Sequence, residues 1–417
     1  MWNGGNAKER YGSSELYDRI QQDALLLIES MGMKASPGVV DKIRAALDPG
    51  EAAHLIYAPE VGRFYISEKS VEMCMERVRQ GFDYWPAGFG TGGMAAYVVD
   101  ANGPRTAALD DITRLAQIVA RTDEYSSIQT SFNPCSKIKK SDAQKRREIE
   151  CAGIDLMIRY AEGKLVTPTI RNDESIRYLA GYYDRGYRVG AALSIVSTFL
   201  TVSEEMVDPF IETVKANVPF LMNSMPIAGL TGPYSTTSLV TLAHAEALFG
   251  MCLAQLIRPG IKIVNAAMPT VADVKRKDMP LRFGSLSNTL INILLAELNA
   301  HLGLPTCQSA CAHSRDIFDE EAVKEASITY TLINRFQYHM LRHPFGYASQ
   351  LNDFNLDTME QEIELYRRIC RNPVPGVDPK PAEYDDQGLE AIMEGVSRGD
   401  FRNLDHTLKN VGCSFCD

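Results

Sequence analysis

The sequence has no excess of positive charge. Its 43 Lys and Arg residues are outnumbered by 53 Asp and Glu residues, which gives a formal net charge of −10. A chain of this sign is not expected to bind the phosphate backbone of nucleic acid or an anionic membrane surface. We therefore expect neither among its partners.

Uninterrupted apolar runs of membrane-spanning length, about 18 residues or more, are also missing. The segment that looks most apolar, residues 189–202, is interrupted by four hydroxyl side chains. The first residues lack the basic and then apolar layout of a secretory signal. These absences predict a cytoplasmic protein that does not span a membrane.

Cysteine is present but not concentrated. The nine Cys residues are scattered over 417 positions, so reduced thiols are expected rather than a disulfide framework. A terminal pair, Cys413 and Cys416, has CxxC spacing. Without a second pair, this spacing is more typical of a loose tail than of a metal site.

Past Asp110, short apolar runs alternate with helical patterns. The expected strands are residues 127–132, 165–169, 191–199, 218–222, 261–266, 306–310 and 345–348. The expected helices are residues 143–161, 173–185, 203–217, 235–257, 285–302 and 358–371. This alternation predicts βαβ units and an α/β fold, with a (β/α)8 TIM barrel favoured over an open doubly wound sheet.

The remaining segments flank this barrel. Residues 1–105 are expected to form a small N-terminal α+β subdomain, with helices over 16–33 and from the capping Ser67 to Gly81. Residues 106–372 would form the barrel. The proline-rich segment 373–417 would form a C-terminal extension.

A glycine-rich sequence, GFGTGG at residues 88–93, has the GxGxxG spacing of dinucleotide sites. Its context does not fit such a site, because Trp85 and Pro86 precede it and a strand-like segment follows it. We interpret it as a flexible loop of the N-terminal subdomain that could cover a barrel mouth. Phe89 and Tyr97 could then reach a ligand.

Polar residues follow two predicted strands, where barrel enzymes carry ligand groups. Asn223 opens a loop that runs to Pro233 and to a helix capped near Ser235 or Thr236, where free N–H groups could receive an anion. Asn265 ends the next strand. For both, an ordinary turn remains an open alternative.

A third strand end carries Cys307, Cys311 and His313. Two thiolates and an imidazole are suitable zinc ligands, but the spacing C-x3-C-x-H is unfamiliar and no fourth ligand is evident. Buried thiols beside a substrate-facing His313 are the favoured interpretation.

Aromatic residues gather near the predicted loops: Tyr97, Phe199, Tyr234, Phe283, Phe345 and Tyr347. Together they could form a cage for a quaternary ammonium group, because aromatic faces attract cations. Taken singly, each of them is expected to be part of the core packing.

The order of these segments from Leu16 to about Arg371 resembles the trimethylamine methyltransferase family, specifically members without pyrrolysine that are similar to glycine betaine methyltransferases. The stretches that carry the resemblance are TAALDDI at 106–112, GLTGP at 229–233, PG at 259–260, GLPTC at 303–307 and PFG at 344–346. The resemblance implies a barrel that moves a methyl group from a quaternary amine to the Co(I) of a cobalamin. That corrinoid would be carried by a separate small protein.

Within this resemblance, we expect the aromatic rings of Tyr97, Tyr234 and Phe283 to hold the substrate cation. Asn223, Asn265 and His313 would bind its anionic end. The missing pyrrolysine argues against trimethylamine itself as the substrate, and a homo-oligomer is expected by analogy. Two alternatives remain open: a zinc-thiolate methyltransferase using Cys307, Cys311 and His313, and a barrel that binds quaternary amines without catalysis.

Overall fold

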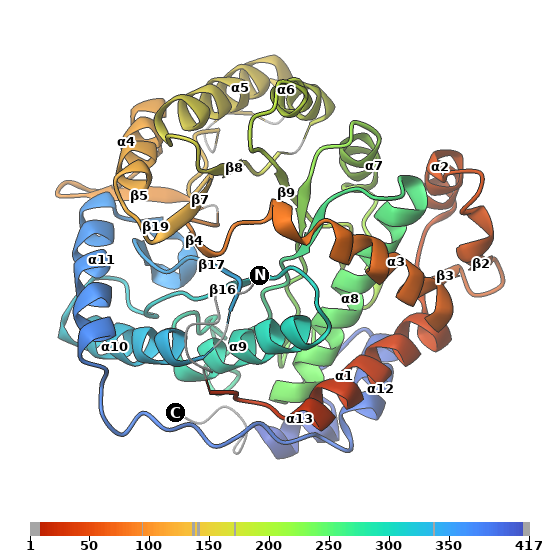
Figure 1. Ribbon diagram of the computed structural model, residues 1–417. Coiled ribbons are helices and arrows are strands. Elements are labelled where there is room, and N and C mark those ends of the chain that lie inside the picture. The colour runs from red at the N-terminus through yellow and green to blue at the C-terminus, as the bar shows by residue number, and fades with distance from the viewer. Residues whose placement is uncertain are drawn as a thin grey trace.

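The computed structural model describes residues 9–93, 95–135, 138–139, 142–170, 172–336 and 338–411. Its centre is a ring of parallel strands, seen along its axis in Figure 1. The eight strands are β4 (Gly88–Gly90), β7 (Tyr125–Gln129), β8 (Leu165–Thr167), β9 (Ala191–Leu193), β12 (Phe220–Met222), β14 (Ile263–Asn265), β16 (Cys307–Ser309) and β17 (Met340–Arg342).

The strands follow one another around the ring in chain order. Five pair in the order β16-β17-β4-β7-β8 and three in the order β14-β12-β9. Parallel bridges join the two sheets at both ends: Val166 with Val189 and Thr169 with Ala192 on one side, and Asn265 with Thr306 on the other. The ring therefore closes on itself, and the predicted (β/α)8 barrel is confirmed.

Helices surround the ring on its outer side (Figure 1). They are α4 (Leu109–Ala120), α5 (Ala143–Tyr160), α6 (Asp173–Asp184), α7 (Val207–Lys215), α8 (Thr236–Ile257), α9 (Leu286–His301), α10 (Glu320–Arg335) and α11 (Leu356–Arg371). Several begin where the sequence supplies a side-chain cap: Asn172 caps α6, Ser285 caps α9 and Asp319 caps α10.

Two barrel strands differ from the expectation. The first, β4, lies within the range 1–105 given to the N-terminal subdomain, because a strand of two glycines and one Phe carries no β-branched signal. The last strand is residues 340–342 rather than 345–348. Residues 347–348 form β18 (Tyr347–Ala348), which pairs antiparallel with β19 (Asp353–Phe354). Helix α11 begins at Leu356, two residues before the expected start, and its cap is Asn355.

The N-terminal segment packs against the barrel as an α+β layer. Its elements are α1 (Ser14–Leu26), η1 (Leu27–Met31), β1 (Met33–Lys34), α2 (Pro37–Ala46), η2 (Ala52–His54), β2 (Ile56–Ala58), β3 (Arg63–Tyr65), α3 (Glu68–Gln80) and η3 (Phe82–Tyr84). The barrel contributes the hairpin β10 (Val196–Ser197) and β11 (Thr201–Val202), giving the sheet order β10-β11-β1-β3-β2. The expected cap at Ser67 is present, and the first helical segment ends with Gly32 as the C-cap of η1.

Smaller elements complete the chain. They are β5 (Tyr97–Asp100), β6 (Gly103–Arg105), β13 (Ile227–Ala228), β15 (Thr270–Val271), η4 (Ser349–Leu351), α12 (Gly388–Arg398) and α13 (Asp405–Asn410). The C-terminal extension carries α12, which packs against α8. Cys413 and Cys416 lie outside the described residues.

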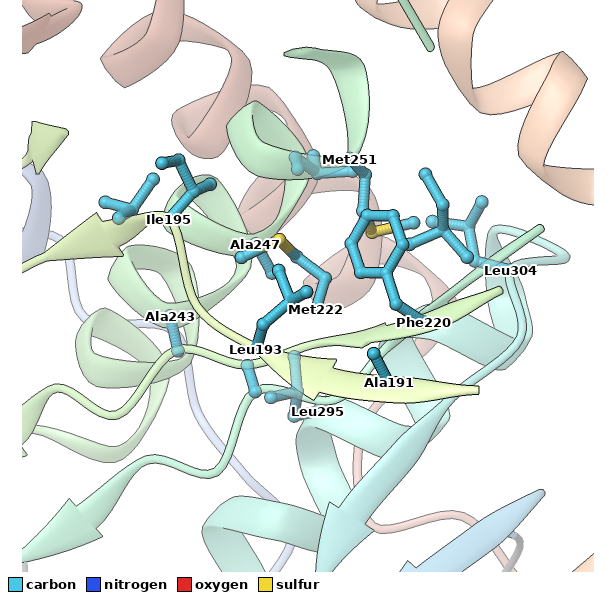
Figure 2. Close-up of a cluster of buried hydrophobic side chains, with 14 of the residues drawn as sticks. Ala191, Leu193, Ile195, Phe220, Met222, Ala243, Ala247, Met251, Leu295 and Leu304 are labelled. Atoms are coloured by element: carbon cyan, nitrogen blue, oxygen red, sulfur yellow. The ribbon is translucent and has the colours of Figure 1, made fainter. Parts of the chain in front are cut away.

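Helix α8 corrects the expectation that residues 189–202 are the most apolar segment. By length and composition α8 could cross a membrane, and its whole apolar window is buried inside the protein. Figure 2 shows Met222 of β12 and Ala247 of α8 in the same apolar layer. A Cβ at Gly250 would lie 2.5 Å from the Met222 sulfur, so glycine lets this helix lie close to the barrel. The apolar character of α8 is explained by a position between the barrel and the outer layers.

Candidate functional site

The carboxyl ends of the barrel strands surround a cavity of about 230 Å³, here called the mouth cavity. In barrel enzymes this face carries the active site. Loops after most of the strands contribute to it, and the lining residues are Gly93, Gln129, Thr169, Ser194, Asn223, Ser224, Met225, Met268, Arg342 and His343.

Arg342, the last residue of β17, brings a buried positive charge to the mouth cavity. Its side chain donates to the Asn223 Oδ1 at 2.9 Å and to the Ala266 carbonyl at 2.6 Å. Burial lowers the pKa of Arg342, and its hydrogen-bond partners among the described residues are an amide oxygen and a backbone carbonyl rather than a carboxylate. A buried guanidinium without a counter-charge is costly, so this site favours an anionic ligand.

His343 follows Arg342 and lies against the glycine-rich loop. Its Nδ1 is 3.0 Å from the Ser309 hydroxyl, and burial together with the Arg342 charge lowers the pKa of His343 well below its usual value. A Cβ at Gly92 or Gly93 would come within 2.9 Å of the imidazole. Glycine is therefore required for this loop to approach the mouth so closely.

Three polar atoms of the lining residues are buried and have no hydrogen-bond partner among the described residues. They are Gln129 Oε1, Arg342 Nε and His343 Nε2. Buried polar atoms are nearly always paired in proteins, so a cluster of unpaired ones indicates a place for a ligand or water. The mouth cavity is the candidate site on this ground.

A second cavity of about 290 Å³, the side cavity, shares Ser194 and Met225 with the mouth cavity. Its lining includes the buried carboxyl group of Glu246 from α8. Burial raises the pKa of Glu246 to about 8, against the opposing effect of a hydrogen bond donated by the Ser224 hydroxyl. Glu246 is therefore mostly protonated at neutral pH.

Of the six predicted substrate-binding residues, the structure brings only Asn223 to the mouth cavity. Asn265 is buried, donates to Asn299 Oδ1 at 2.9 Å and does not line either cavity. Such a side chain serves the packing of the barrel against α9.

The predicted aromatic cage is not assembled at this site. Tyr97 is 48% exposed on the outer sheet beside Asp353, whereas Tyr234 and Phe283 are buried and line neither cavity. Phe89 faces outward from the barrel and packs against Tyr338, Phe345 and Tyr366 instead of a ligand. The two cavities contain no Phe, Tyr or Trp among their lining residues.

The zinc alternative is not supported by the geometry. In the part of the chain that the structure describes, no group of three His, Cys, Asp or Glu residues could hold a metal ion. Cys307 is buried among apolar residues of the barrel interior, and burial raises the pKa of both Cys307 and Cys311. His313 lies 3.3 Å from the buried Glu362 in a separate cavity.

The N-terminus of α8, expected to receive an external anion, meets a carboxylate of the protein itself. Asp385 of the C-terminal extension accepts a hydrogen bond from the Ser238 hydroxyl at 2.7 Å and lies 2.8 Å from His406 Nε2. The negative charge of Asp385 therefore stabilises the positive N-terminal end of the α8 dipole.

The residues of the site that were missed from the sequence include Gln129, Arg342, His343 and Glu246. The signal for Arg342 was its place at the end of an apolar run, Met340–Arg342, but this run was not identified as a strand. Glu246 could have been noticed as one acidic residue in a helix whose residues 237–257 are all buried.

Comparison with known proteins agrees with the resemblance seen in the sequence. The family described as Trimethylamine methyltransferase (MTTB) matches residues 188–417, more than half of the chain. The glycine betaine methyltransferase of Desulfitobacterium hafniense (strain Y51) is 23% identical over 215 residues, which are 51% of this chain and 43% of that protein. The trimethylamine methyltransferase MttB of Methanosarcina barkeri (strain Fusaro / DSM 804) is 28% identical over 212 residues, 51% of this chain and 41% of that protein.

The matched region thus spans less than half of these curated relatives. Among solved structures, 7,8-dihydropteroate synthase from Vibrio fischeri ES114 aligns with a TM-score of 0.40 and 12% identity over 69% of this chain and 95% of that one. The barrel assignment itself comes from the strand order given above.

Proposed function

Because the chain belongs to the trimethylamine methyltransferase family, we propose that it removes a methyl group from a small zwitterionic methylated amine, such as a betaine. The methyl acceptor would be the corrinoid of a separate small protein. The observation that carries the choice of substrate is Arg342, a buried cation at the mouth cavity without a carboxylate partner. A relative that acts on glycine betaine is consistent with this choice.

A substrate with a carboxylate supplies the negative counter-charge that Arg342 lacks, whereas trimethylamine offers only a neutral or positively charged nitrogen. The guanidinium can donate to a carboxylate in two parallel hydrogen bonds, and Nε is the donor still unpaired. Asn223 holds the other side of the guanidinium and therefore fixes its orientation. Fixed geometry matters here because methyl transfer from an activated nitrogen depends mainly on positioning.

The corrinoid supplies the nucleophile that accepts the methyl group. At about 230 Å³ the mouth cavity is smaller than the roughly 300–1,000 Å³ of pockets for drug-sized ligands, so it fits a small amine and not a corrinoid ring. A corrinoid must therefore be presented from outside, at the carboxyl face of the barrel. The chain's own contribution is to bind the amine, orient it and exclude water.

The test is anaerobic. Reduced cobalamin is mixed with the protein and a panel of glycine betaine, carnitine, γ-butyrobetaine, choline and trimethylamine, and methylation is followed by the visible spectrum. We expect conversion with at least one carboxylate-bearing compound and none with trimethylamine. Arg342→Lys should lower kcat/KM by on the order of tenfold to a hundredfold, because a Lys cannot reproduce the planar pair of donors.

Two results would contradict the proposal. Conversion of trimethylamine at a rate equal to that of the betaines would show that the reaction does not need a substrate carboxylate bound to Arg342. Binding of betaines without any conversion, even with a matched corrinoid protein, would identify a non-catalytic amine-binding barrel.

A further inference from the structure

Glu246 is a buried ionisable group next to the mouth cavity that the proposed function leaves unused. It is 3% exposed, lines the side cavity, and lies in α8 among apolar residues. A buried carboxyl group in an apolar helix destabilises the fold unless it is neutral or paired, so its presence there calls for a functional reason.

The loop after β12 joins Glu246 to Arg342. Side chains of consecutive residues in an extended segment point to opposite sides. Met222 faces α8 at Gly250, and two residues later Ser224 faces Glu246, one helical turn nearer the start of the helix. Between them, Asn223 faces Arg342. Adjacent residues of one loop thus hold a buried cation and a buried carboxyl group.

We propose that the side cavity receives the ammonium end of the zwitterionic amine, and that Glu246, aligned by Ser224, is its counter-charge. This inference rests on the proposed function and adds to it the group that recognises the positively charged end of the substrate. Ser194 and Met225 line both cavities, so the two cavities are adjacent, and the proposal requires a short molecule to place one end in each.

The absence of aromatic side chains from the lining of both cavities supports a carboxylate as the cation receptor. Quaternary ammonium groups are otherwise held by aromatic rings. The other lining groups of the side cavity, which include Val196, Ser203 and Met206, carry no negative charge. Among the residues that line it, Glu246 alone can supply one.

Binding of the cation should also change the protonation state of Glu246, and this change can be measured separately from the affinity. Burial and the Ser224 hydrogen bond are the influences on the pKa of Glu246, and no charged side chain of the described residues contributes. A cation beside the carboxyl group stabilises its ionised form, so binding should release a proton to the solvent at neutral pH.

The experiment compares pairs of ligands that differ only in the charged atom. Glycine betaine is matched by 3,3-dimethylbutanoate, and γ-butyrobetaine by 5,5-dimethylhexanoate, in which carbon replaces the ammonium nitrogen. Isothermal titration calorimetry in two buffers of different ionisation enthalpy gives both affinity and proton release. For the wild-type protein we expect one betaine to bind at least about tenfold more tightly than its carbon analogue, with proton release.

Glu246→Gln should abolish this preference while the carbon analogue still binds through Arg342. Glutamine keeps the size and can still accept from Ser224, so the fold should be retained. The matched control is Glu297→Gln, a second buried acid, which accepts from Tyr17 and the backbone of residues 11–12 and lines neither cavity. It should leave the preference unchanged.

The outcomes separate the two proposals. If the wild-type protein binds a betaine and its analogue equally, or if Glu246→Gln keeps the preference, the role of Glu246 is overturned and the proposed function stands. If none of the four ligands binds, the betaine function fails and the role of Glu246 fails with it.

Discussion

At the scale of single residues, Glu246 makes stability depend on pH in a direction opposite to most acidic residues. Its pKa in the folded protein is about 8, compared with about 4.3 in an unfolded chain. The stabilisation that Glu246 contributes is fully present below about pH 4. It decreases as pH rises toward 8, because in that range the unfolded chain loses the proton while the folded protein keeps it.

Glu246→Gln removes this titration. We therefore expect the variant to gain stability over the wild-type protein between pH 5 and 8.5, by an amount on the order of a few kcal/mol at the upper end. Urea unfolding at pH 5, 7 and 8.5 measures the difference. A difference that does not change with pH would show that Glu246 is already ionised in the folded protein.

Gly92 tests how closely the glycine-rich loop must approach the mouth. It has a φ of +73°, and a Cβ there would lie 2.7 Å from the Arg342 Cβ and 2.8 Å from the His343 ring. Gly92→Ala should destabilise by about 1–2 kcal/mol through backbone strain and also weaken substrate binding by displacing both side chains.

Gly163→Ala is the control for that experiment. Gly163 has a φ of +80° and nothing within 4 Å of an added Cβ. The Gly163→Ala variant should therefore show the backbone strain alone, without steric contacts to other side chains. Thermal unfolding and betaine titration of both variants separate the two effects. Equal losses of binding would mean that the loop does not position the site.

The sequence predicted Asn223 because a polar residue after an apolar run is visible locally. It could not predict Arg342 in the same way, because the last strand was placed at 345–348 and Arg342 then fell before it. The aromatic residues show the opposite failure. Tyr234 and Phe283 stand near predicted loops, but only packing in three dimensions decides that they are buried away from the cavities.

At the scale of elements, Asp385 joins the C-terminal extension to the start of α8. Burial raises the pKa of Asp385, but hydrogen bonds from His406, Ser235 and Ser238 outweigh it and hold the pKa well below its usual value. The stabilisation is present above the unfolded pKa of about 3.9 and is lost as pH falls below it.

Asp385→Asn should therefore lower the free energy of unfolding at pH 7 by about 1–2 kcal/mol. The difference from the wild-type protein should shrink below pH 4. Denaturant titrations at pH 7 and pH 3 test this expectation. Asp386→Asn is a suitable comparison, because Asp386 pairs with Arg19 on the exposed surface and should have a smaller effect.

Elements with their own caps and long apolar periodicity were predictable. The helices α5, α6, α8 and α9 lie within about two residues of their expected positions. The three-residue strands β12, β14 and β16 all lie within expected strands, although β12 and β16 contain no β-branched residue. The glycine-containing β4 gains its strand conformation from pairing with β7 and β17, which no local pattern reveals.

At the scale of the whole molecule, the N-terminal layer, the barrel and the extension share one apolar core. A single cluster of buried residues runs from Tyr11 through Leu248 to Leu404. We expect one thermal unfolding transition by calorimetry, with the same midpoint by circular dichroism. A separate early transition that removes only the extension would show that these parts unfold independently.

The seam between β17 and β4 has a consequence for biosynthesis. The seam pairs Met340 with Gly88, about 250 residues earlier in the chain. The ring cannot close until most of the polypeptide has left the ribosome, so a nascent chain carries two unpaired parallel edges throughout elongation. Contacts of such high sequence separation slow folding, and exposed edges invite intermolecular pairing. Expression yield should therefore depend strongly on chaperones and on the rate of translation.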